Sequence, residues 1–193
     1  MIDGIWEPTK ERLESLNEEI LRLTRMLSGL DKIAEIENND IGLNRTYFDI
    51  FEFTNKLVLN FEFYIREKNI TLNVEGSSLR IYADKDKIGQ VIINLISNAI
   101  KYTNINGEIS ISILDKGNEV EFSITDNGAG IEKEDLPYIF ERLYRADKSR
   151  SGNTGGNGMG LAVVKAIVDG HNGKITVKSE SEFGSKFTVT LPK

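Results

Sequence analysis

Two kinds of spacing between apolar residues occur along this chain. Short segments rich in apolar and β-branched residues, some alternating with polar ones, are typical of strands that bury one face. Longer segments repeat apolar residues every three or four positions, as amphipathic helices do. The predicted strands are Thr46–Ile50, Ile70–Val74, Arg80–Ala83, Glu108–Leu114, Glu119–Thr125, Lys174–Ser179 and Lys186–Leu191, and the predicted helices are Asn55–Lys68, Lys85–Thr103 and Met159–His171. This order predicts an α+β fold, a two-layer α/β sandwich with helices on one face of a mixed sheet.

The N-terminal segment has a third pattern, a heptad seam of the kind found in helical bundles. Its apolar positions alternate in spacing between three and four residues, and they are Leu13, Leu16, Ile20, Leu23, Leu27, Leu30 and Ala34. We expect a long helix whose exposed leucines drive self-association into a homodimer; a helix lying on its own domain is the alternative. Because turn residues fill Glu37–Gly42, we predict two domains, residues 1–40 and 41–193.

Composition narrows the choice of function. The chain has 193 residues, enough for one α/β core plus the long helix, and a net charge of −6, which argues against a nucleic-acid surface. It has no cysteine, which is consistent with a reducing compartment. No signal peptide or apolar run of transmembrane length is present, so we expect a cytoplasmic domain whose parent protein reaches the membrane only through other segments.

The predicted helix Lys85–Thr103 carries a polar stripe on an otherwise apolar surface. Asn94 and Asn98 are four residues apart and therefore share one face, and Lys101 follows one turn later. Amide oxygens can ligate Mg²⁺, and a lysine can neutralise phosphate charge. The stripe indicates a site for a metal-bound polyphosphate, although a simply solvated helix face is the alternative.

Two glycine-rich segments follow. Asp126 comes directly after a predicted strand, with Gly128 and Gly130 behind it, and a carboxylate there could accept the exocyclic amine of adenine and discriminate against guanine. An ordinary Asp-Asn-Gly turn is the alternative. The second segment, Gly152–Gly160, enters a predicted helix and could offer backbone N–H groups to phosphates, or it could be a linker. It matches neither the P-loop nor the dinucleotide-binding fingerprint.

Taken together, these segments resemble the conserved boxes of sensor histidine kinases of two-component systems. The similarity extends from about Thr46 to the C-terminus. In chain order, the segments similar to the N, first-glycine, F, second-glycine and last glycine boxes are Asn94–Tyr102, Asp126–Gly130, Ile139–Arg145, Gly156–Gly160 and Gly184–Phe187. The resemblance implies the Bergerat-type ATP-binding fold that this family shares with DNA gyrase, the Hsp90 chaperone and the MutL repair protein.

The resemblance also implies a role for each candidate residue. Asn98 would bind Mg²⁺ through its amide oxygen, with Asn94 close to the metal or its water. Tyr102 would pack against adenine, and Asp126 would accept its amine. Lys101 and Arg145, with the backbone at Gly156, Gly158, Gly160 and Leu161, would contact the phosphates, and Gly128 and Gly130 would line the base pocket. For Arg142, the resemblance leaves two roles open: contact with phosphate, or an interface with the phosphoacceptor helix.

Within this superfamily, the chain resembles the kinases more than the ATPases. The position that carries a glutamate general base in the gyrase-like ATPases is Asn94 here, and an amide cannot take a proton from water at neutral pH. Lys101-Tyr102 is also similar to the kinase branch. The implied reaction is transfer of the ATP γ-phosphoryl group to a protein histidine, with slow hydrolysis at best.

The resemblance further implies an acceptor on another segment. Residues 1–40 are similar to the second helix of a dimerisation and phosphotransfer hairpin, and Met1–Trp6 to the loop before it, so we expect the histidine-bearing first helix to be absent. The only histidine, His171, lies between Gly170 and Gly173 and is interpreted as structural. We therefore expect that this chain cannot phosphorylate itself. We also expect a mobile lid over residues 146–154.

Three functions remain for comparison with the structure. The first is the ATP-binding catalytic domain of a sensor histidine kinase, which would phosphorylate a histidine on a phosphoacceptor helix and signal to a response regulator. The second is a non-catalytic nucleotide-binding regulatory module, which the missing acceptor favours. The third is a superfamily ATPase, which Asn94 disfavours. All three would bind ATP, and we expect Mg²⁺ as the second cofactor.

Overall fold

The computed structural model describes residues 42–145 and 158–193. Its centre is a five-stranded sheet with the order β2-β4-β5-β7-β6, in which only β2 and β4 are parallel. The strands are β2 (Thr71–Glu75), β4 (Glu108–Asp115), β5 (Glu119–Asp126), β6 (Lys174–Glu180) and β7 (Gly184–Pro192). The predicted heptad helix, the predicted lid and Gly156 lie outside the described residues.

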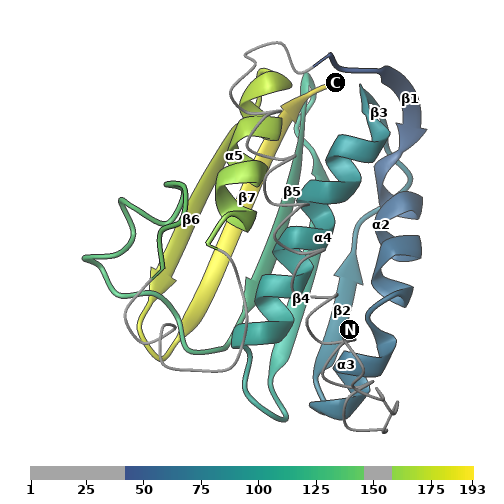
Figure 1. Ribbon diagram of the computed structural model, residues 1–193. Coiled ribbons are helices and arrows are strands. Elements are labelled where there is room, and N and C mark those ends of the chain that lie inside the picture. Colours follow the sequence, from purple (N-terminus) through teal and green to yellow (C-terminus); the bar gives the residue numbers. More distant parts are fainter. Residues whose placement is uncertain (1–41, 146–157) are drawn as a thin grey trace, which may run out of the picture. The chain divides into compact units, whose positions relative to one another are not determined.

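Helices α2 (Ile50–Leu59), α4 (Lys85–Tyr102) and α5 (Gly160–Gly170) lie on one face of this sheet (Figure 1). The inward side chains of β4, such as Ile109 and Ile111, are fully buried, as are Leu95 and Ile96 of α4. Burial of these apolar side chains holds the two layers together. The predicted two-layer sandwich with a mixed sheet is therefore confirmed.

Strands β1 (Arg45–Asp49) and β3 (Arg80–Asp84) form a separate two-stranded antiparallel sheet. The chain turns directly from β3 into α4, because the side chain of Asp84 caps the helix by accepting the backbone N–H groups of Asp86 and Lys87. This short sheet therefore fixes where the asparagine-bearing helix begins.

The prediction of a single helix over Asn55–Lys68 was wrong at its start and in its continuity, whereas its end lies within one residue of the observed one. The first helix, α2, begins at Ile50, because the Asp49 carboxylate accepts the backbone N–H of Glu52 at 2.8 Å. It ends at Leu59, and a second short helix, α3, covers Glu62–Glu67. The predicted strand Thr46–Ile50 ends one residue earlier for the same reason, since Ile50 is the first helical residue.

Candidate nucleotide site

Asn94, the first residue of the polar stripe of α4, faces the start of α5. Asn94 donates its amide hydrogen to the carbonyl of Gln90 at 2.8 Å. A Cβ placed on Gly160, the first residue of α5, would lie 3.1 Å from Oδ1 of Asn94, so the amide oxygen is turned toward this helix N-terminus. Asn98 is half-buried one turn further along α4. An amide oxygen near backbone N–H groups at a helix start is a suitable setting for a metal-bound phosphate.

Asp126 ends β5 and is 7% exposed. Its Oδ1 accepts the backbone N–H of Gly128 at 2.9 Å. Burial raises the pKa of this carboxyl above its ordinary value, although hydrogen bonds from the backbone of Gly128 and Ser185 oppose the rise. A buried acceptor that retains lone pairs can select a ligand that offers it a hydrogen bond, because leaving it unpaired costs about 1–3 kcal/mol.

The loop after Asp126 packs directly against the end of α4. A Cβ on Gly128 would lie 2.2 Å from the carbonyl oxygen of Tyr102, so only glycine fits there. The next residue, Ala129, donates its backbone N–H to the same oxygen at 3.1 Å. These two contacts hold Tyr102 against the loop that begins at Asp126, so the two residues predicted to bind adenine lie close together.

Gly130 lies against the turn between β6 and β7. It has a φ of +66°, and a Cβ would lie 2.0 Å from the carbonyl oxygen of Glu180, so glycine is required for both reasons. The following residue, Ile131, donates its N–H to Oγ of Ser179, which also contacts Ser185 Oγ at 2.9 Å. The last glycine box thereby supports the loop that carries Asp126.

Lys101 and Tyr102 interact with each other at the end of α4. The ammonium nitrogen of Lys101 lies 4.7 Å from the centre of the Tyr102 ring. Tyr102 is 42% exposed, so part of its side chain is accessible to a ligand.

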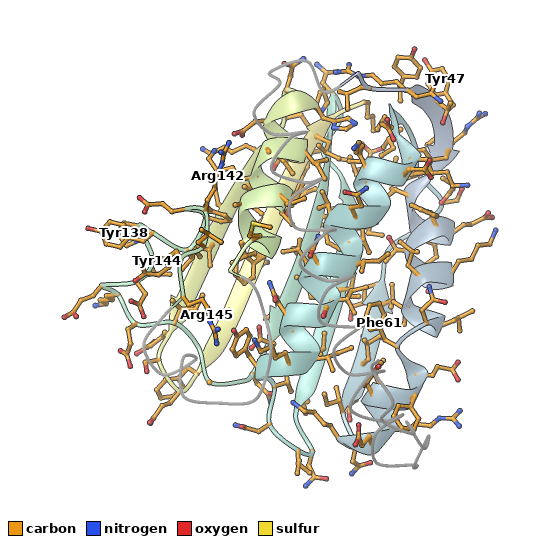
Figure 2. All side chains as sticks on the ribbon, viewed as in Figure 1. Tyr47, Phe61, Tyr138, Arg142, Tyr144 and Arg145 are labelled. Atoms are coloured by element: carbon orange, nitrogen blue, oxygen red, sulfur yellow. The ribbon has the colours of Figure 1, made fainter. Side chains whose placement is uncertain are left out.

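The segment 132–145 forms turns rather than a helix or strand, and two tyrosines in it make contacts that hold it together. The hydroxyl of Tyr144 donates to Asp135 at 2.6 Å, and the Tyr138 and Tyr144 rings lie 5.6 Å apart. In Figure 2, Arg145 lies on the inner side of this segment and points toward the middle of the molecule, whereas Tyr138 points outward. Gly158 lies beside this segment, since a Cβ on it would be 2.8 Å from the carbonyl oxygen of Tyr144. Leu161 follows in the first turn of α5.

The donor set fits Mg²⁺ held mainly by phosphates. Within the ranges 42–145 and 158–193, no group of three or more His, Cys, Asp or Glu side chains could hold a metal ion. Asn94 and Asn98 offer neutral amide oxygens instead. Mg²⁺ commonly keeps several waters and takes one or two protein ligands plus substrate phosphates, which suits such a sparse set.

Sequence reasoning overlooked several residues that hold the site together. Lys68 and Thr103 bond the last turn of α4, and Ser179 and Ser185 support the Asp126 loop. The serines lie in or near the last glycine box and could have been considered on that basis. Lys68 lies 35 positions before Thr103, whose carbonyl it binds, and the sequence offers no local signal for such a contact.

Comparison with known proteins agrees with this geometry. The family model described as histidine kinase-, DNA gyrase B- and HSP90-like ATPase matches residues 83–193. This stretch contains α4, the Asp126 loop and α5. The chain belongs to this family, and its fold is that of the ATP-binding catalytic domain of sensor histidine kinases.

Among the relatives, the sensor histidine kinase WalK of Bacillus subtilis (strain 168) is 34% identical over 200 residues, which cover 100% of this chain and 32% of the relative. The sensor protein kinase WalK of Staphylococcus aureus is 31% identical, over 98% of this chain and 47% of the relative. The chain therefore spans about a third to about a half of the length of these relatives.

Solved structures of histidine kinases share the fold. Acinetobacter baumannii histidine kinase AdeS has a TM-score of 0.80 and 29% identity, covering 99% of this chain and 88% of that one. The catalytic domain of histidine kinase ThkA has a TM-score of 0.69 and 31% identity, covering 78% of this chain and 96% of that one.

In the described part of this chain, no helix is long and apolar enough to cross a membrane.

Proposed function

We propose that this domain binds Mg²⁺-ATP and transfers the γ-phosphoryl group to a histidine on a separate phosphoacceptor helix. The observation that carries the proposal is the buried Asp126 carboxyl, held by Gly128 on a loop that packs against Tyr102. Asp126 would accept the adenine amine, Tyr102 would cover the ring, and Gly128 and Gly130 would line the pocket. Guanine presents a carbonyl oxygen at the same position and would be repelled, so the pocket selects ATP.

The phosphates would extend from this pocket toward α5. Asn98, with Asn94 beside it, would hold Mg²⁺, and Lys101 and Arg145 would neutralise phosphate charge. The backbone of Gly156, Gly158, Gly160 and Leu161 would bond the phosphate oxygens. Mg²⁺ would supply charge neutralisation when bound, and the protein's share is to orient the nucleotide.

The transfer would proceed by attack of a histidine nitrogen on the γ-phosphorus as its bond to the β–γ bridging oxygen breaks, which releases ADP. No water needs to be deprotonated, which agrees with an amide at Asn94. This chain's single histidine is an unsuitable acceptor, because His171 is 3% exposed and both ring nitrogens have partners. Nδ1 lies 2.8 Å from the carbonyl oxygen of Ile167, and Nε2 accepts the backbone N–H of Asp84 at 3.0 Å.

The acceptor would therefore come from another helix, in the same protein or a second copy, and residues 1–40 would form the second helix of the hairpin that dimerises and carries it. A response regulator would receive the phosphoryl group, as suggested by a structure of ThkA in complex with the response regulator protein TrrA, which has a TM-score of 0.76 and 29% identity to this chain. Because ATP is a cytoplasmic nucleotide, the domain would act on the cytoplasmic side.

A non-catalytic module that binds nucleotide and regulates a partner is the second candidate. The observation that favours it is the same burial of His171, since the chain offers no exposed histidine of its own. The two candidates share the nucleotide site and differ only in phosphoryl transfer.

Transfer can be tested by adding a separately purified phosphoacceptor hairpin from a related kinase to this chain with Mg²⁺ and γ-labelled ATP. We expect acid-labile label on the hairpin histidine, and a loss of at least tenfold in rate for Asn98→Ala. The exposed Asn118→Ala is the matched control and should transfer at the original rate. ATP binding without labelling of any acceptor hairpin tried would favour the regulatory module.

A further inference from the structure

The C-terminus of α4 is closed by a lysine from a distant part of the chain. Nζ of Lys68, which follows α3, donates to the carbonyl oxygens of Ile100 at 2.8 Å, Lys101 at 3.0 Å and Thr103 at 2.9 Å. An ammonium group has three N–H donors, and here each has a backbone acceptor. The last carbonyls of a helix lack partners within the helix and usually face water, so this side chain replaces that water.

The remaining carbonyls of this turn are bonded as well. Thr103 donates both its N–H and its hydroxyl to the carbonyl oxygen of Ala99, at 2.9 and 2.7 Å. The carbonyl of Tyr102 accepts the N–H of Ala129. Every carbonyl from Ala99 to Thr103 therefore has a partner, and Lys68 supplies three of the five residues with theirs. The turn that carries Lys101 and Tyr102 is held from one side by Lys68 and from the other by the Asp126 loop.

Lys68 also fastens the loop that follows α4. Its carbonyl accepts the N–H of Asn106 at 2.9 Å, and its neighbour Asn69 donates to the side chain of Asn106 at 2.7 Å. Lys68 is half-buried, and its ammonium lies at the helix end where the macrodipole places partial negative charge. Both effects favour one conformation of this turn over a frayed one.

We propose that Lys68 is a positioning residue for nucleotide binding. It holds the last turn of α4 so that Lys101 and the Tyr102 ring stay beside the Asp126 pocket when no ligand is present. The inference rests on the nucleotide site proposed above, and Lys68 itself acts only through the α4 backbone. Without the ammonium, this turn would fray, and a ligand would have to order it on binding, which lowers affinity.

The test is the affinity for ATP, measured by calorimetry at a temperature where each variant is folded. Lys68→Met keeps the alkyl chain and removes the three donors, and we expect its dissociation constant for ATP to rise about tenfold. Lys68→Arg, which restores charge and donors, should recover most of the affinity. The matched control is Lys56→Met, an exposed lysine in the last turn of α2, which should bind ATP as the unaltered chain does.

A purely structural cap would give a different result. In that case Lys68→Met would lower the thermal midpoint while the folded fraction bound ATP with unchanged affinity, and the proposal would be overturned. If Lys68→Met does not fold, Lys68→Gln, which keeps an N–H donor without the charge, takes its place with the same two outcomes.

A double-mutant cycle separates action through Tyr102 from a general loss of order. In a Tyr102→Leu background, Lys68→Met should have a much smaller effect on ATP affinity, because the ring that Lys68 positions is gone. An undiminished effect would overturn the proposed route. Failure of the unaltered chain to bind ATP would instead contradict the proposed function, so the two failures are distinguishable.

Discussion

Helix α4 is held at its two ends by different chemistry. At the N-terminus, a single carboxylate caps the helix. Asp84 accepts the backbone N–H groups of Asp86 and Lys87 with one oxygen and that of Asn44 with the other. At the C-terminus, an ammonium from Lys68 and a backbone N–H from Ala129 bind the carbonyls. Each end thus uses the charge sign that the helix dipole favours.

The difference lies in what each end supports. The N-terminal cap is itself braced by buried groups, since the N–H of Asp84 donates to the ring of His171. The C-terminal turn carries Lys101 and the half-exposed Tyr102 beside a loop that needs glycine at position 128. We therefore expect changes at the first end to alter stability and changes at the second to alter nucleotide affinity.

The strongest way to break this division is Gly128→Ala. The added Cβ would meet the Tyr102 carbonyl at 2.2 Å, so the Asp126 loop and the end of α4 must move apart. We expect ATP affinity to fall by more than tenfold and unfolding free energy to fall by about 1–3 kcal/mol. Calorimetry and urea denaturation measure the two effects. Gly42→Ala, where a Cβ would meet no atom within 4 Å, is the control, and equal effects of the two variants would contradict the close packing.

At the opposite end of the helix, Asp84→Ala should lower stability with little change in affinity. It leaves three backbone donors without their acceptor, and loss of a helix cap costs about 1–2 kcal/mol. The exposed Asp86→Ala in the first turn should cost only a few tenths of a kcal/mol. If Asp84→Ala weakened ATP binding as much as Gly128→Ala, the two ends would not be separable.

The smallest expected effect is the pH dependence contributed by His171. Burial lowers the pKa of this imidazole below its ordinary value, and the charge of Arg45 adds to the shift, although the Ile167 carbonyl and Asp84 oppose it. As the pH falls, the unfolded chain therefore binds a proton on this imidazole at a higher pH than the folded chain does. Stability should be complete above the usual histidine pKa of about 6.5 and should fall as the pH drops from there toward the lower folded pKa.

The measurement is direct because the chain has one histidine, whose ring protons can be followed by NMR as the pH changes. A folded pKa at or above the ordinary value would contradict the buried neutral ring. In urea denaturation, His171→Gln should remove this part of the pH dependence while that of Asp126, whose raised pKa acts in the opposite direction, remains.

Sequence reasoning predicted the layers and the strands of the main sheet well, because those strands bury one face and the alternation of their side chains is strong. It misplaced α2 because the apolar run after Asp49 hid the helix start. The pair Asp49 and Glu52 has the spacing of a capping box and could have corrected the error.

For the site, the motifs predicted which residues bind the nucleotide but not which contacts hold those residues in place. The contact of Gly128 with Tyr102 and the three bonds from Lys68 join residues that are at least 26 positions apart. Such contacts depend on how the layers pack, and no local pattern encodes them.

The most direct measurement is calorimetric titration of this chain and of Asp126→Asn with ATP and GTP in the presence of Mg²⁺. We expect the unaltered chain to bind ATP at least tenfold more tightly than GTP and Asp126→Asn to lose most of that preference, because an amide can accept from the adenine amine with its oxygen or donate to the guanine carbonyl with its NH2 group. Equal affinity for the two nucleotides, or an Asp126→Asn variant that retains the preference, would contradict Asp126 as the residue that selects adenine.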